Sequence, residues 1–287
     1  MAVDKALDKS FEQIILELKK AAGASLTEII IGTALVLFTI AVIYKKTYHD
    51  GTKPPTCDDY VYNTFLYVIL GLLLVITLCM VNDKLPILPD ITRLVQLSSN
   101  SFVIFIMMIL MIAIMGVFMY LTKTSDPTNV IKIHAYWGIF VYLLASILYL
   151  LYIVSRYMNV FQIGMLITAI IVGITIYIGY TYPTLITPET RNILIGVLIV
   201  VIIIGFGAIF FVKDPKTLGI IMTIITVISL LLFIAFLLME VGKVRENSKT
   251  CVVPNYPGES VLIIYDIIII FKNVLSLLTG RGRKRKF

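Results

Sequence analysis

Asp266 is a carboxylate inside an apolar run near the carboxyl end of the chain. A charged side chain within a bilayer costs at least ~2.5 kcal/mol on insertion scales. Such a group needs a partner, water or a proton, and removal from water favours the neutral acid. We interpret Asp266 as a candidate proton-sensing or cation-coordinating residue. The competing interpretation is an acid that bonds to tyrosine or backbone, or that stays hydrated near the interface.

Glu240 is the acidic residue with which Asp266 is most naturally paired, since it ends the preceding apolar run. If the two runs are antiparallel neighbours, the two carboxyls lie within a few turns of each other in depth. Two acids so close do not both ionise readily, so they share a proton or bind a cation together. The alternative for Glu240 is an ordinary interfacial charge beside Lys243 and Arg245.

The elements that must position these acids are long apolar helices. Of the 287 residues 59% are hydrophobic and 14% are charged, which excludes a water-soluble surface. A spanning helix needs about 20 apolar residues, and the runs lack the alternation of membrane strands. We therefore predict an all-α polytopic membrane protein with about eight transmembrane helices. The predicted spans are Ile29 to Tyr44, Tyr60 to Met80, Phe102 to Leu121, Ala135 to Val154, Phe161 to Tyr180, Ile193 to Val212, Leu218 to Met239 and Val261 to Leu278.

The predicted domains are an amino-terminal segment (1–27), a helical membrane domain (28–279) and a basic tail (280–287). Lys5 to Lys20 mixes apolar and charged residues at helical period, which predicts an amphipathic helix. Such a helix lies on the membrane surface or, alternatively, packs on the protein's own loops. No signal-peptide pattern precedes the first span, so we expect that span to be its own insertion signal.

Lysine and arginine residues outside the spans predict the orientation, because cytoplasmic loops carry the excess. The side that holds the amino terminus, here called side A, collects 14 of them, and the opposite side B collects 9. Lys272, inside the last span, completes the 24. We therefore expect both termini in the cytosol.

Two of the three cysteines face the same side of the membrane in this topology. Cys57 follows the first span and Cys251 precedes the last, which places both on side B. In an oxidising lumen or exterior they are able to form a disulfide, and two free thiols are the simpler alternative. Cys79 is interpreted as a small buried hydrophobic residue.

Hydroxyl groups recur in the fourth and fifth spans. Such residues either line a polar path or serve as interhelical hydrogen-bonding groups and interfacial anchors. The residues are Tyr142, Ser146, Tyr149, Thr168, Thr175, Tyr177 and Tyr180.

The sequence lacks the motifs of catalytic or metal sites. It contains no His-Glu-x-x-His pair, no Gly-x-Ser-x-Gly elbow and no phosphate-binding glycine loop. His49 and His134 stand singly at span edges. We therefore expect no enzymatic activity, no cofactor and no bound metal.

The carboxyl-terminal tail is strongly basic. Each basic residue near an anionic membrane surface contributes about 1 kcal/mol of attraction, which favours lipid headgroups as a partner. Simple positive-inside anchoring and an acidic protein partner are the alternatives, and nucleic acid is the less favoured partner. The basic residues are Arg281, Arg283, Lys284, Arg285 and Lys286.

The two acids stand in short sequence patterns, Met239-Glu240 and Tyr265-Asp266. With its surroundings, the stretch Leu231 to Gly280 resembles the carboxyl-terminal third of the transmembrane Bax inhibitor motif family. In that family the sixth core helix ends in Tyr-Asp, and the last helix carries Asp within an apolar run. Here Glu replaces the first Asp, and one extra span precedes the seven-helix core.

The resemblance implies a pH-sensitive calcium leak gated by paired acids, with suppression of cell death as its outcome. It also implies the endoplasmic reticulum or another internal membrane, and Ca²⁺ as the transported ion. The competing hypothesis is a non-transporting membrane scaffold, in an organelle or an enveloped-virus assembly. The basic tail of such a scaffold would recruit an acidic partner.

Overall fold

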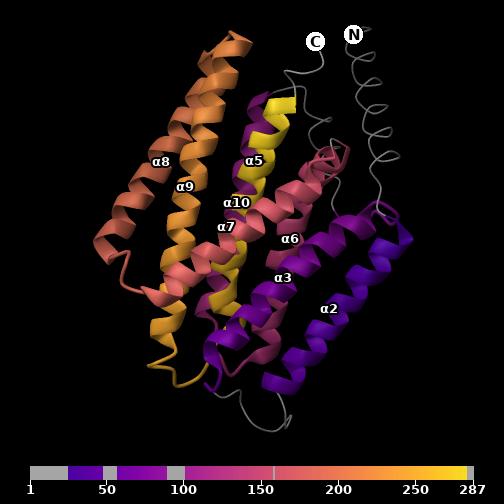
Figure 1. The fold of residues 1–287 in the computed structure, drawn as a ribbon, viewed down its shortest axis with the longest axis vertical. Coiled ribbons are helices and arrows are strands. Elements are labelled where there is room, and N and C mark those ends of the chain that lie inside the picture. The colour runs from indigo at the N-terminus through magenta and orange to yellow at the C-terminus, as the bar shows by residue number, and fades with distance from the viewer. Residues whose placement is uncertain (1–24, 48–56, 89–100, 158, 283–287) are drawn as a thin grey trace. The chain divides into compact units, whose positions relative to one another are not determined.

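The computed structural model describes residues 25–47, 57–88, 101–157 and 159–282. Within these ranges the regular secondary structure is helical (Figure 1). The helices are α2 (Leu26–Thr47), α3 (Tyr60–Asn82), α5 (Ser101–Thr124), α6 (Val130–Tyr157), α7 (Phe161–Thr181), α8 (Pro188–Phe211), α9 (Pro215–Asn247) and α10 (Tyr256–Gly282).

Each predicted span coincides with one of these helices, which confirms the all-α polytopic class. Seven helices of the described ranges are long and apolar enough to cross a bilayer, namely α2, α3 and α6 to α10. The third predicted span falls on α5, a helix of 24 residues that is also mostly apolar. Several helices extend beyond the apolar runs, because polar residues at their ends continue the backbone hydrogen bonds. The amphipathic helix predicted over Lys5 to Lys20 lies outside the described residues.

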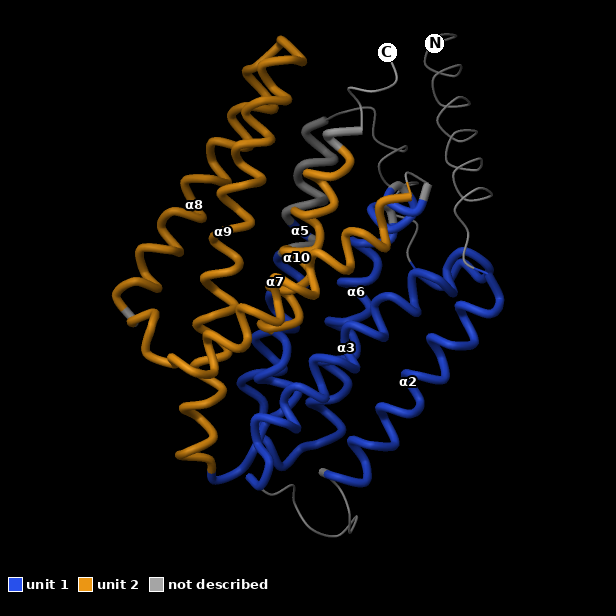
Figure 2. The backbone as a smooth tube through the Cα atoms, in the orientation of Figure 1, with its two compact units in different colours: residues 1–157, 252–261 blue, residues 158–251, 262–287 orange. Residues whose placement is uncertain are grey.

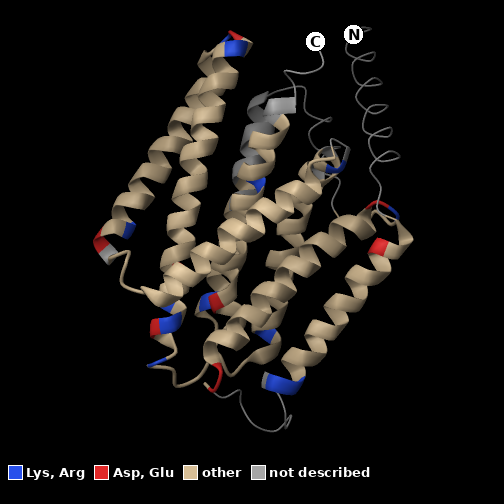
Figure 3. Ribbon diagram, viewed as in Figure 1, with Lys and Arg blue, Asp and Glu red and all other residues tan. Residues whose placement is uncertain are grey.

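Local sequence explains where the helices of the carboxyl-terminal half begin. Asp214 caps α9, where its carboxylate accepts hydrogen bonds from the backbone N–H groups of Lys216 and Thr217. Thr187 caps α8 in the same way. Each cap is followed by proline at the first helical position, where the missing N–H costs nothing. Charged residues concentrate near the helix ends, and uncharged residues fill the long middle sections (Figure 3).

The chain divides into two compact units (Figure 2). Unit 1 comprises residues 1–157 and 252–261, and in it α3 packs on α2 and α6, and α5 packs on α6. Glu28 of α2 accepts two hydrogen bonds from the guanidinium of Arg156 of α6, at 2.8 and 3.1 Å. This bidentate pair ties the first span to the rest of the unit.

Unit 2 comprises residues 158–251 and 262–287, and in it α9 packs on α7 and α8. Two glycines permit close approach. A Cβ atom at Gly179 of α7 would lie 2.8 Å from the carbonyl oxygen of Leu238 in α9. One at Gly242 of α9 would lie 2.6 Å from the carbonyl oxygen of Pro183, just after α7. The end of α7 is therefore held tightly against the end of α9.

Helix α10 belongs to both units, with its first turn in unit 1 and the remainder in unit 2 (Figure 2). The first turn is well anchored within unit 1. Trp137 of α6 donates from Nε1 to Ser260 Oγ at 2.9 Å, and the Tyr256 ring lies 5.4 Å from that of Tyr60. Asp266 follows six residues after Ser260 on the same helix.

Candidate functional site: a buried pair of carboxyls

The structure places Asp266 and Glu240 in the interior of unit 2. Asp266 of α10 is 5% exposed, and Glu240 of α9 is 4% exposed. Glu240 is also the charged group with which Asp266 interacts electrostatically within the described ranges. The two acids therefore face a shared interior rather than separate surfaces.

A hydrogen bond between α9 and α10 gives a common level from which the depth of each acid can be worked out. Asn273 Nδ2 of α10 donates to Ser229 Oγ of α9 at 3.0 Å, so these two residues lie at one level. A helix rises 1.5 Å per residue, which puts Asp266 about 10 Å and Glu240 about 16 Å from that level. Because α9 and α10 cross in opposite directions, both displacements run toward side B. The two carboxyls thus differ in depth by about 6 Å, or roughly one helical turn.

Arg245 and Lys272, two basic residues near the acids in sequence, are directed elsewhere. The guanidinium of Arg245 donates to the carbonyl oxygens of Tyr180 and Thr181 at the end of α7, and it lies 4.9 Å from the Tyr180 ring centroid. Lys272 is exposed and lies six residues after Asp266, about 240° around the helix. Among the described residues, no basic side chain interacts with Asp266.

Aromatic rings of α9 and α10 pack against one another close in sequence to the acids. The rings of Phe233 and Phe236 lie 5.7 Å apart, and the Phe233 ring lies 5.9 Å from that of Tyr265. Phe233 and Phe236 are 7% and 9% exposed. Because Asp266 and Glu240 are themselves buried, an uncompensated charge on either of them is costly.

The hydroxyl groups singled out in the sequence have different roles in the structure. In unit 1, Tyr142 donates to the Ile87 carbonyl at 2.7 Å, and Tyr149 donates to Asp83 Oδ1 at 3.0 Å. Ser146 bonds within its own helix. These three residues therefore act as hydrogen-bonding groups between or within segments.

In unit 2, Tyr177 and Tyr180 are exposed near the end of α7, where interfacial anchors belong. Thr175 is buried, and its hydroxyl donates to the Ile171 carbonyl at 2.7 Å. Thr168 is also buried, and its hydroxyl has no hydrogen-bond partner among the residues that the structure describes.

Cys57 and Cys251 are both disulfide-bonded, and Cys79 is a buried free thiol. Because disulfides persist only in oxidising compartments, a Cys57–Cys251 link in the cell stays a prediction. Of the basic tail, Arg281 lies within α10, whereas Arg283, Lys284, Arg285 and Lys286 lie outside the described residues.

The structure assembles one polar group in unit 1 that sequence reasoning missed. His134 Nε2 of α6 lies 2.7 Å from the Tyr67 hydroxyl of α3, and His134 Nδ1 lies 2.7 Å from the Val130 carbonyl oxygen. A carbonyl only accepts, so Nδ1 carries a proton, and Nε2 accepts from Tyr67 when the ring is neutral. No local signal predicts this contact, because it depends on the pairing of α3 with α6.

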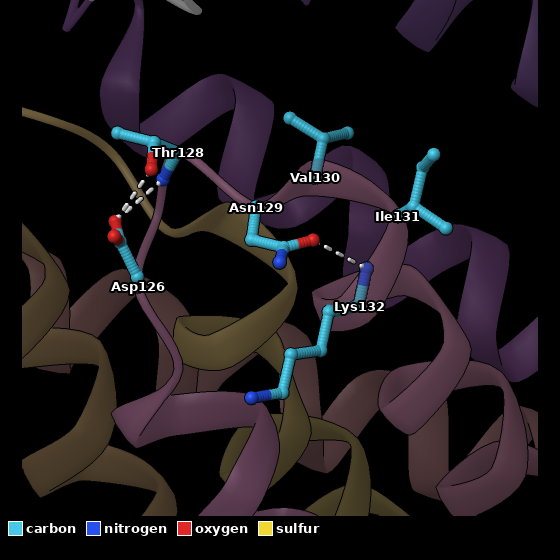
Figure 4. A pocket seen from close by; sticks show the side chains of 6 residues that line it. All are labelled: Asp126, Thr128, Asn129, Val130, Ile131 and Lys132. Carbon is cyan, nitrogen blue, oxygen red and sulfur yellow. Dashed lines mark hydrogen bonds between the residues drawn. The ribbon is translucent and has the colours of Figure 1, made fainter.

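An open pocket of about 470 Å³ lies at the loop between α5 and α6 (Figure 4). Asp126 Oδ1 accepts from the backbone and hydroxyl of Thr128, and Asn129 accepts from the backbone of Lys132. The Asn129 bond caps the start of α6, and the Asp126 bonds form the turn before it, so these polar groups serve to shape the loop and the helix end.

The comparisons with known proteins bear on the site because they cover both acids. The family described as inhibitor of apoptosis-promoting Bax1 matches residues 57–283. The chain belongs to this family. The match extends well beyond the carboxyl-terminal third that carried the sequence resemblance. No curated protein and no solved structure matches the chain.

The family match does not include α2. The matched region begins at Cys57, after α2, and among the described residues it contains α3 and the helices from α5 to α10. The first span therefore lies outside the matched region. Glu240 and Asp266 both lie inside the matched region.

Proposed function

We propose that the protein is a pH-sensitive leak for calcium or related cations, controlled by Asp266 and Glu240. The observation that carries this proposal is the burial of both carboxyls in unit 2 without a basic partner among the described residues. A buried acid without a counter-charge holds either a proton or a cation. A proton and a cation are thus alternative occupants of the site that the two carboxyls form.

Protons and cations compete for the pair in this mechanism. Asp266 interacts electrostatically with Glu240, so the two carboxyls repel each other when both are ionised, and this repulsion favours a proton on one of them. A divalent cation relieves the same repulsion when the proton leaves. Exchange between the two occupants changes the charge within unit 2, and this links the leak to pH.

The carboxyl pair is better suited to the passage of a cation than to tight binding of one. A tightly held Ca²⁺ ion takes six to eight oxygen ligands, whereas two carboxyls supply at most four. Across the described ranges, no group of three or more His, Cys, Asp and Glu side chains is arranged to hold a metal ion. A cation at the pair therefore keeps much of its water and is able to leave again.

At the cellular level, the proposal extends to calcium release from the endoplasmic reticulum or another internal membrane, with suppression of cell death as the outcome. Family membership supports this extension. The proposed orientation has both termini in the cytosol, with the basic tail against anionic lipid headgroups. No catalytic activity forms part of the proposal.

The test is calcium efflux from liposomes that contain the purified full-length protein. The expected result is an efflux above that of protein-free liposomes, which Asp266→Asn strongly reduces. Tyr265→Phe is the matched control, because it changes the adjacent residue without altering charge. Absence of calcium efflux at every pH from 5 to 8 would overturn the proposal and favour the scaffold.

A further inference from the structure

Helix α10 carries a lysine in the part of the chain that crosses the membrane. Lys272 is exposed, and among the described residues its ammonium group makes no ion pair and no hydrogen bond. The apolar segment of α10 runs from Tyr256 to Thr279, and Lys272 lies seven residues before its end, or about 10 Å inside side A. A cation at this depth is costly unless an anion compensates it, so Lys272 calls for an anionic partner.

Two neighbouring helices of unit 2 mark the packed faces of α10. Asn273 donates to Ser229 of α9 at 3.0 Å, and Gly164 of α7 lies against the side chain of Leu275. At about 100° per residue, positions 273 and 275 point about 200° apart around the helix. The arc between them that passes through Val274 is buried. The remaining arc, of about 160°, is here called the outer face of α10.

The outer face carries two polar side chains one turn apart. Lys272 and Ser276 both lie within it, and both are exposed. Hydroxyl groups in membrane helices usually bond back to the carbonyl oxygen four residues earlier, as Thr279 does to Leu275. Within the described ranges the Ser276 hydroxyl makes no such bond. An ammonium group and a hydroxyl are therefore both available on one side of α10.

Helices α7 and α9 leave the outer face open toward side A. They lie against each other at their side B ends, where Gly179 approaches Leu238. From this contact they diverge, α9 continues alongside α8, and the second half of α10 is seen between α7 and α9 (Figure 1). The exposure of Lys272 and Ser276 agrees with this separation. A lipid of the side A leaflet thus has access to both side chains from within the membrane.

We propose that Lys272 and Ser276 bind the headgroup of an anionic phospholipid from the side A leaflet. The ammonium group pairs with the phosphate, and the Ser276 hydroxyl donates to a headgroup oxygen. Lys272 lies about 6 Å deeper than Ser276, so the flexible lysine stem bends toward side A to meet the headgroup. A lipid fits better than a phosphate ion in water, because both residues lie within the apolar segment of α10. The site is separate from the carboxyl pair and from the basic tail, and it does not rest on the proposed leak.

The test measures how phosphatidylserine and phosphatidylcholine with identical acyl chains bind to the purified full-length protein in detergent, by native mass spectrometry. Lys272→Gln is expected to weaken phosphatidylserine binding about fivefold or more. Phosphatidylcholine binding is expected to stay nearly unchanged, because choline already neutralises its phosphate. Lys272→Arg is expected to retain phosphatidylserine binding, since a guanidinium also pairs with phosphate. Lys216→Gln is the matched control, because it removes an exposed charge on the same side of the membrane, in the first turn of α9.

Ser276→Ala is an independent variant, with an expected loss of phosphatidylserine affinity of about threefold. Monodisperse elution identifies folded protein. Simple snorkelling of Lys272 to water predicts that folded Lys272→Gln binds phosphatidylserine as the wild type does, or loses both lipids equally, and either result overturns the site. So does folded Ser276→Ala with wild-type affinity, or an equal loss for Lys216→Gln, which indicates general surface attraction. Competition by inorganic phosphate would place the ligand in water, and an altered oligomeric state with unchanged lipid affinity would identify a protein partner instead.

Discussion

At the scale of single residues, the sequence and the structure agree on where the unusual charge lies. An acid within an apolar run is conspicuous in a sequence, and Asp266 is indeed buried in α10. Glu240 was a weaker signal, because it stands beside Lys243 and Arg245 at the polar end of a run. Glu240 is nevertheless buried, and Arg245 bonds instead to the end of α7, a contact between segments far apart in sequence. The burial of Thr168, whose hydroxyl has no partner within the described ranges, was unpredictable because it also depends on how the helices pack.

Asp214 gives a residue-scale prediction about pH. The Thr217 hydroxyl and the backbone N–H groups of Thr217 and Lys216 lower the pKa of Asp214 below its ordinary value of 3.8. A depressed carboxyl pKa contributes stability above the ordinary pKa, and this contribution is lost as the pH falls through the folded-state pKa. We expect Asp214→Ala to lower the unfolding temperature in detergent at pH 7, and this deficit to shrink toward pH 3.

Asp214→Asn serves as its control, because asparagine caps a helix without the charge. Its deficit at pH 7 is expected to be smaller and less dependent on pH. A deficit for Asp214→Ala that stays constant from pH 7 to pH 3 would contradict the role of the carboxylate.

At the scale of elements, the length of the apolar runs predicted the helices. Close contacts at glycine positions explain how some of these helices pack. Runs of about 20 apolar residues suffice to place the spans, because the bilayer fixes their length. Which helices pair is not encoded in such runs. Gly179 and Gly173 lie on the same helix, yet only the former approaches α9 closely.

These two glycines provide a matched test of the α7–α9 contact. Gly179→Ala is expected to destabilise the protein by about 1–3 kcal/mol, because the new Cβ meets the backbone of Leu238. Gly173→Ala is expected to be neutral or to stabilise by up to about 1 kcal/mol, since nothing lies within 4 Å and alanine favours helices. Chemical unfolding in mixed micelles measures both. Equal effects of the two substitutions would contradict the packing of α7 on α9.

The docking of α2 is a separate property of unit 1. Glu28→Gln removes the bidentate pair with Arg156, whose side chain is 20% exposed while that of Glu28 is 37% exposed. We expect a loss of about 0.5–1 kcal/mol of stability, since partial exposure screens the pair. Lys46→Gln is the control, because its pair with Asp59 is more exposed and longer, at 3.6 Å. A Glu28→Gln protein as stable as the control would show that apolar packing alone holds α2.

At the scale of the whole molecule, the redox state of the cysteines on side B tests the orientation of the chain in the membrane. If side B faces an oxidising lumen or exterior, mass spectrometry of unreduced protein is expected to find Cys57 and Cys251 in one linked peptide. The buried Cys79 is then expected to react with alkylating reagents only after unfolding. Alkylation of Cys57 and Cys251 in the native, unreduced protein would place side B in a reducing compartment and reverse the proposed orientation.

The central claim concerns the carboxyl pair and is tested by the pH profile of calcium efflux. Efflux is measured from pH 5 to 8 in liposomes that contain either the wild type or Asp266→Asn at matched protein density. The account predicts a wild-type efflux that changes by about tenfold or more across this range, and an Asp266→Asn efflux that is low and independent of pH. Identical pH profiles for the two proteins would contradict it, because the leak would then respond to a group other than Asp266.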